Sequence, residues 1–416
     1  MATFTFYDGN KGFQQRGFDL YTWDEEAETD SLSVLVFDES QGIPYDPAVF
    51  AYRIEIDLEG LVMYQITEGP YAGDERPIAG TATGIRFYDM AGNLLMQGTG
   101  LKGDVPTIAT MMERGDNFRA MLVAMQGDNT FIGSNDSGAM DWDGDEITTG
   151  AGRDTVYAND GDDYIADRGG RDSYFGGDGV DQISYAEHWF WDDPVGAVVG
   201  LRVDLAAGTV RGPDKQVDTL SSIEQIRGTH LNDTMVGDDA NNTFFGLAGN
   251  DRLDGGAGFD TVRYDRDDRY FGVDGILANL ANGRVRDAFG FTDRVTNIEA
   301  LRGTEQRDRI FDDNANNAFR GNGGNDYFSL SGGNDTVRGG ADRDQFVFVG
   351  TSFGTDVIED FSLADRDRIQ ILEADSMDDL TFLQQGSTGI VRLNANSQVL
   401  LLNFDVNTLD AADFIF

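Results

Sequence analysis

The feature that most constrains this chain is a strict nine-residue period between about residues 127 and 347. Aspartate, or twice asparagine, returns at every ninth residue in three runs, and an apolar residue follows two places later in fourteen of fifteen units. The periodic positions are Asp136, Asp145, Asp154, Asp163, Asp172 and Asp181, then Asp233, Asn242, Asp251 and Asp260, then Asp308, Asn317, Asp326, Asp335 and Asp344. A flexible Gly/Asp linker would keep this composition but not the apolar position. The period therefore predicts a folded repeat.

The fullest unit is Gly255-Gly256-Ala257-Gly258-Phe259-Asp260-Thr261-Val262-Arg263. This Gly-Gly-x-Gly-x-Asp-x-apolar-x pattern resembles the nonapeptide of the RTX (repeats-in-toxin) hemolysin-type calcium-binding family. The resemblance implies a parallel β-roll, in which six loop residues and three strand residues make half of one coil and the apolar side chain points inward. Loops eighteen residues apart then stack along one edge of the roll.

Stacked loops of this kind predict cation sites made of oxygen. Each slot would hold two aspartate carboxylates and backbone carbonyls, with glycines taking the positive φ values that a tight loop needs. Ca²⁺ takes about 6 to 8 oxygen ligands and tolerates irregular geometry, so it is expected rather than Mg²⁺. Nine pairs of periodic residues lie eighteen apart, so at most about nine ions are expected. The candidate site residues are Asp145, Gly150, Gly152, Asp154, Gly161, Asp163, Gly170, Asp172, Gly177, Gly179, Asp181, Gly249, Asp251, Gly256, Gly258, Asp260, Gly324, Asp326, Gly333, Asp335 and Asp344.

The stretches between the runs resemble each other. Residues 218–229 return 75 positions later as 293–304, which indicates a duplicated unit and predicts strand pairs laid on the roll. After the last run, residues 348–416 resemble the cap that closes RTX rolls, and a solenoid needs such a lid. The last four residues, 413–416, are an acid and three apolar residues, similar to the carboxy-terminal signal of type I secretion substrates.

Residues 1–126 read as ordinary globular β protein. Residues 51–59 alternate apolar and charged side chains at the period of a half-buried strand. We expect a sandwich-like β domain, with one or two short helices at 108–112 and 118–125. The predicted fold is all-β, with domains at 1–126 (β-rich, of unknown ligand), 127–184 (first roll run), 185–230 (β spacer), 231–263 (second run), 264–305 (β spacer), 306–347 (third run) and 348–416 (cap and secretion signal).

Composition narrows the function. The formal net charge of −43 makes nucleic acid a poor partner for the bulk surface. The chain has no cysteine and two histidines, which excludes a catalytic thiol and any motif rich in histidine ligands. The amino terminus shows no secretory signal, and no apolar run approaches the ~20 residues of a spanning helix.

Two functional hypotheses follow. The first is a non-enzymatic, calcium-binding protein exported by type I secretion machinery, which folds on Ca²⁺ outside the cell and binds a glycan or the cell envelope. The second is an extracellular hydrolase, carbohydrate-active for example, with its site in residues 1–126. Paired carboxylates such as Glu55 and Glu59 could nominally serve such an enzyme, but their choice is arbitrary in so acidic a chain. No catalytic residue is therefore assigned.

Overall fold

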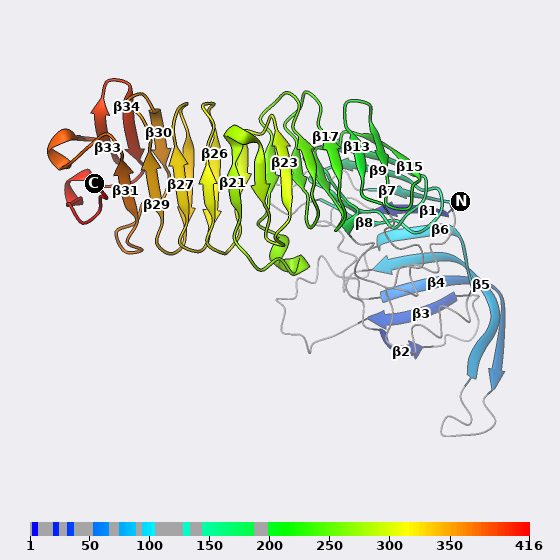
Figure 1. Ribbon diagram of the computed structural model, residues 1–416. Helices are drawn as coiled ribbons and strands as arrows, with labels where there is room; N and C mark the ends of the chain where they lie inside the picture. Colours follow the sequence, from blue (N-terminus) through cyan, green and yellow to red (C-terminus); the bar gives the residue numbers. More distant parts are fainter. Residues whose placement is uncertain are drawn as a thin grey trace. The chain divides into compact units, whose positions relative to one another are not determined.

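The computed structural model describes residues 128–133, 144–186 and 199–416, and the backbone of six strands nearer the amino terminus. Regular structure in these residues is β-strand with short 3₁₀ turns, so the all-β prediction is confirmed for them (Figure 1). No helix of the described part is long and apolar enough to cross a membrane. The helices expected at 108–112 and 118–125, and the first periodic aspartate Asp136, lie outside the described residues.

The amino-terminal strands form one antiparallel sheet. They are β1 (Ala2–Phe6), β2 (Leu20–Asp24), β3 (Ser31–Val36), β4 (Arg53–Gln65), β5 (Glu75–Tyr88) and β6 (Leu94–Asp104). Their order is β2-β3-β4-β5-β6-β1, and β1 then pairs in parallel with β7 (Asn129–Ile132), the first strand of the roll. These described strands belong to a single layer, so the packing of two sheets expected for a sandwich stays a prediction.

The chain divides into two compact units, residues 1–198 with 208–225, and residues 199–207 with 226–416. In the first unit one face of the roll is a parallel sheet that contains β7, β9 (Thr155–Asp160), β11 (Ser173–Asp178) and β15 (Val217–Ser221), with β14 (Thr209–Arg211) antiparallel to β15. The other face contains β8 (Glu146–Thr148), β10 (Tyr164–Ala166) and β12 (Gln182–Ser184). The register is eighteen residues, as predicted: Val156 pairs with Tyr174, and Ile165 with Ile183.

The second unit repeats this plan. One face contains β13 (Arg202–Asp204), β17 (Thr234–Val236), β19 (Arg252–Asp254), β23 (Thr292–Thr296), β22 (Arg284–Arg286), β21 (Leu277–Asn279), β25 (Arg309–Phe311), β27 (Tyr327–Leu330), β29 (Gln345–Phe348) and β31 (Arg368–Ile371). The other contains β18 (Thr243–Phe245), β20 (Thr261–Arg263), β24 (Ala300–Arg302), β26 (Ala318–Asn322), β28 (Thr336–Gly340) and β30 (Gly354–Ile358). As expected, the spacer strand β22 lies antiparallel between two neighbours, and the pairing becomes parallel again beyond it.

The core is one column of apolar side chains on each face. The residue two places after each described periodic position is 0 or 1% exposed, as at Phe244, Leu253 and Val337. The residue before it is less buried, and the residue after it is exposed in some strands and buried in others, as Phe245 is. Phe328 and Phe346 stack with ring centroids 5.5 Å apart. Burying such a side chain stabilises the fold by about 1.5 to 3 kcal/mol, but each half-turn supplies only one. The roll therefore depends on its loops as well as on its core.

The carboxy-terminal part closes the second unit. β34 (Ser397–Leu401) pairs in parallel with β30, and β33 (Thr388–Asn394) and β32 (Thr381–Gln385) add to it in antiparallel order (Figure 1). Phe361 packs against Phe404 with ring centroids 5.2 Å apart, and Phe414 forms a parallel bridge with Ile369. These contacts hold residues near the end of the chain against the last strands of the roll, and their role as the expected cap stays a prediction.

Candidate metal centre

The periodic aspartates form ladders along the loops of the roll. The backbone N–H of each described periodic residue with a partner eighteen positions later donates to Oδ1 of that partner. At Asp154 and Asp172 the distance is 2.6 Å, at Asp233 and Asp251 it is 2.8 Å, and at Asp326 and Asp344 it is 2.9 Å. The same bond occurs in the other five described pairs. We call the side chain of each periodic residue a rung of its ladder. Oδ1 of each accepting rung therefore joins two neighbouring coils.

The second oxygen of most rungs is buried and has no hydrogen-bond partner among the described residues. These oxygens are Oδ2 of Asp154, Asp163, Asp181, Asp251, Asp260, Asp326, Asp335, Asp344 and Asp356. Each of these residues is at most 2% exposed. Leaving a buried acceptor unsatisfied costs about 1 to 3 kcal/mol, and more when it is charged. Nine such atoms, spread over the three runs, point to a ligand that the protein itself does not supply.

Glycines bring the loops close to these oxygens. In the first loop position, a Cβ on Gly246 or Gly255 would lie 2.5 Å from Oδ2 of Asp251 or Asp260. At the fourth position Gly258 has φ +130°, and a Cβ there would lie 2.6 Å from the carbonyl oxygen of Ala240 in the coil before. The predicted site glycines 152, 161, 170, 177, 179, 249, 256, 324 and 333 share the positive φ, whereas Gly150 does not. Carboxylate and carbonyl oxygens thus line the same narrow slot.

Burial strongly perturbs the protonation of the ladder. Removal from water raises the pKa of Asp163 and Asp344 to about 8, and that of Asp172 and Asp326 to about 9. Neighbouring rungs add repulsion, since Asp308 and Asp344 both raise the pKa of Asp326. These four carboxylates can therefore be fully ionised at neutral pH only when positive charge is brought to them.

Residues outside the nonapeptides continue the ladder at the end of each run. Asp172 and Asp181 donate their N–H groups to Asp218 and Glu224, both at 3.0 Å. In the second run Asp251 and Asp260 do the same to Asp293 and Glu299, at 3.0 and 2.9 Å. In the third run Asp335 and Asp344 donate to Asp356 and Asp367 of the cap.

Sequence reasoning missed these six terminal acids. It recognised 218–229 and 293–304 as a duplicated stretch but treated it only as strands. The signal was present, because each copy keeps an aspartate and a glutamate six residues apart.

The first rungs of the second and third runs differ from the others. Oδ2 of Asp233 accepts the N–H of Thr229 at 2.7 Å, and Oδ2 of Asp308 accepts that of Thr304 at 2.7 Å. Asn242 and Asn317 place a neutral amide in the ladder, as the sequence indicates. The open oxygens are therefore concentrated at the later rungs of each run.

One cluster in the first unit combines carboxylates with tyrosines. Oxygen atoms of Asp167, Asp172 and Asp218 lie within 4.8 Å of one another, and all three residues are buried. The hydroxyl of Tyr174 donates to Oδ2 of Asp167 at 2.9 Å, and that of Tyr185 donates to Oδ2 of Asp218 at 3.2 Å. Asp167 and Asp218 were not among the predicted site residues.

These structural features match a known repeat. A scan of protein families matches the RTX calcium-binding nonapeptide repeat (4 copies) at residues 141–166, 148–183, 228–262, 298–328 and 311–346. The repeat region belongs to the RTX hemolysin-type calcium-binding family. RTX repeats bind Ca²⁺, and the all-oxygen donor set, the open Oδ2 atoms and the glycine-lined slots of this chain fit that ion.

Comparisons of the whole chain add little. No curated protein matches. Among solved structures, the chain is similar to the crystal structure of extracellular lipase LipA from Serratia marcescens, at 18% identity and a TM-score of 0.20. The alignment covers 48% of this chain and 41% of that lipase, so the chain spans less than half of its length. Likeness at this level carries no argument about activity.

Proposed function

We propose that the RTX loops of this chain hold several Ca²⁺ ions, at most about nine, between the stacked aspartates. The observation that carries the proposal is the series of buried Oδ2 atoms without a partner, one per open rung. Asp154, Asp163 and Asp181 would hold ions in the first run, Asp251 and Asp260 in the second, and Asp326, Asp335 and Asp344 in the third. Backbone carbonyls of the loops complete each set. A bound divalent ion supplies the positive charge that keeps neighbouring carboxylates ionised at close range.

The same residues couple calcium to folding. Without positive charge in the slots, buried carboxylates repel one another, and a core of one apolar residue per half-turn does not offset a backbone entropy of about 1 to 2 kcal/mol per residue. Extracellular calcium modules have dissociation constants on the order of 10⁻⁴ to 10⁻³ M. The aspartates would therefore lack the ion in a calcium-poor cytosol and gain it outside. Binding to the folded state alone stabilises that state at every site.

This coupling supports a biological role. We infer that the chain is a secreted or surface protein, exported unfolded by type I secretion machinery and folded on Ca²⁺ afterwards. Its role would be non-enzymatic, with adhesion to a glycan or to the cell envelope. The RTX repeats and the acidic charge support this proposal.

Circular dichroism of the full chain tests the folding step. In chelator we expect the far-UV spectrum to lose most of its β signal, and millimolar Ca²⁺ should restore it, whereas equal Mg²⁺ should not. Identical β spectra with chelator and with Ca²⁺ would refute calcium-dependent folding.

A further inference from the structure

A column of arginines runs along one outer face of the roll in the second unit. Arg263, Arg302, Arg320 and Arg338 are paired in register on β20, β24, β26 and β28. Each follows a buried apolar residue, so its side chain is on the outer surface. Neighbouring strands lie about 4.8 Å apart, which places like charges next to one another. This is a concentrated positive strip on a chain of net charge −43.

The two ends of the column are neutralised and the middle is not. Arg263 forms a two-pronged pair with Asp265, at 2.9 and 2.7 Å, and Arg338 lies 3.4 Å from Asp360. Arg302 and Arg320 make no ion pair or side-chain hydrogen bond with other described residues. Partial burial and the neighbouring Arg263 and Arg320 lower the pKa of Arg302, and Asp265 opposes this only in part, so a further anion beside Arg302 would relieve the repulsion.

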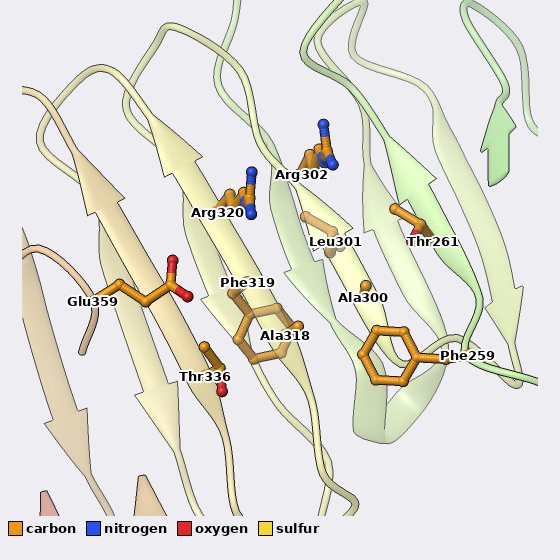
Figure 2. Close-up of a pocket in the computed structure, with 10 residues that line it drawn as sticks. All are labelled: Phe259, Thr261, Ala300, Leu301, Arg302, Ala318, Phe319, Arg320, Thr336 and Glu359. Carbon is orange, nitrogen blue, oxygen red and sulfur yellow. The ribbon is translucent and has the colours of Figure 1, made fainter. Parts of the chain in front are cut away.

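The unpaired arginines line a cavity of about 210 Å³. Its floor is made of small side chains, Ala300, Ala318, Thr261 and Thr336, one from each of the four strands. Figure 2 shows Arg302 and Arg320 side by side, with the ring of Phe259 towards one end and the carboxylate of Glu359 towards the other. Phe259 is 44% exposed, so its ring is accessible to a ligand in the cavity.

We propose that this groove, lined by Arg302, Arg320, Phe259 and Thr336, binds an acidic glycan through the carboxylate of a uronic acid. Planar guanidinium groups pair with carboxylates in a two-pronged geometry. The hydroxyls and the aromatic ring suit the polar edges and the apolar face of a sugar. Glu359 disfavours ligands of dense negative charge. A peptide strand cannot add here, because β24 and β26 are already paired on both sides.

The inference deepens the proposed glycan-binding role and places it in the roll rather than in residues 1–126. It rests on the calcium-loaded fold. Binding is therefore measured on the full chain in constant 5 mM CaCl₂, with circular dichroism run on the same samples. A folded protein that fails to bind refutes the groove alone, whereas a protein that does not fold refutes the proposed function.

The probe is a hyaluronan hexasaccharide, which alternates uronic acid with a neutral sugar, titrated by calorimetry. We expect wild-type protein to bind it, and Arg302→Gln and Arg320→Gln each to weaken binding at least about tenfold. Phe259→Ala should weaken it as well, and Glu359→Gln should strengthen it. The matched control is Arg294→Gln, because Arg294 is exposed and paired with Arg252 on the other face of the roll. It should leave binding unchanged.

Several results would overturn the proposal. They are no binding by folded wild-type protein, equal binding by Arg302→Gln and Arg320→Gln, or equal loss in Arg294→Gln. Equal binding of the neutral N-acetylglucosamine hexamer would show that the groove does not recognise the carboxylate of a uronic acid. Equal binding of hexaglutamate would show a site for acidic peptides instead.

Discussion

Replacing Asp326 by asparagine should change stability in opposite directions with and without calcium. Oδ1 of Asp326 accepts the N–H of Asp308 at 2.8 Å, and its Oδ2 is buried without a partner. Asparagine keeps the shape and the first acceptor, so the rung survives. The substitution removes a negative charge that bound calcium would neutralise. Without calcium, burial and the neighbouring Asp308 and Asp344 disfavour that charge more than Arg307 favours it.

The magnitudes follow from burial and mass action. Without calcium the pKa of Asp326 is about 9 in the folded state, against about 3.9 unfolded. At pH 7 this difference opposes folding by about 4 kcal/mol, since one pKa unit is about 1.4 kcal/mol. The Asp326→Asn substitution would remove up to that amount. With calcium at about a hundred times the dissociation constant, loss of one site destabilises the folded state by about 2.7 kcal/mol.

Hydrogen exchange of peptides from 306–347 reads both changes locally. Asp326→Asn should exchange faster than wild type in 10 mM CaCl₂. In chelator, with trimethylamine N-oxide added to populate the folded state, it should exchange more slowly. The control Asp342→Asn removes one exposed charge from the same run and should do neither. Equal shifts of the same sign in both conditions, or equal effects of the control, would refute the reasoning.

Three further predictions concern the ladder, the loops and the core. The pKa values of Asp154, Asp163, Asp172 and Asp344 are raised to about 7 to 9 in the folded state, so these groups favour the calcium-free fold most below about pH 4 and favour it less as pH rises through 7 to 9. Protein in chelator should therefore show more β signal in circular dichroism at pH 5 than at pH 8.5. A β signal that does not change with pH would contradict the shifts. Gly258→Ala should destabilise the calcium-loaded fold by about 1 to 3 kcal/mol and lower its melting temperature, because φ is +130° and the new Cβ meets the carbonyl of Ala240. The control Gly386→Ala, where a new Cβ has nothing within 4 Å, should cost less. Equal melting of the two variants would count against close stacking of the loops. Phe346→Ala should destabilise the calcium-loaded fold by about 3 to 5 kcal/mol in urea unfolding, because it removes a ring that stacks on Phe328 and is 0% exposed. A loss of stability below about 1 kcal/mol would show that the column of apolar side chains is not the core.

Much of the roll was predictable because its geometry is periodic. A spacing of nine residues determines that Val156 lies beside Tyr174 and that Asp154 reaches Asp172, and the structure confirms that register. The spacers break the period, so the neighbours across them could not be read from spacing. Asp260 meets Glu299 39 residues later, and Arg263 meets Arg302 across the same gap.

The arginine column illustrates the same limit. The ninth position of the repeat varies in sequence, so it gives no sign of a column of arginines. The four guanidinium groups align only because β20 pairs with β24, which follows it after the second spacer. The chain has 28 arginines and three lysines. The arginine column gives a physical context for this preference, since a planar guanidinium stacks on neighbouring rings, as Arg263 does over Phe245 at 4.8 Å. The packing of residues 1–126 lacks any such period and remains a prediction.

The most direct test of the central claim is to count bound calcium by native mass spectrometry of the full chain during a Ca²⁺ titration. We expect several ions, no more than about nine, to bind together over a narrow range of concentration as the charge-state distribution shifts from extended to compact. Compact protein without calcium, or ions that add singly without any change in compactness, would contradict a roll that is held together through its aspartate ladders.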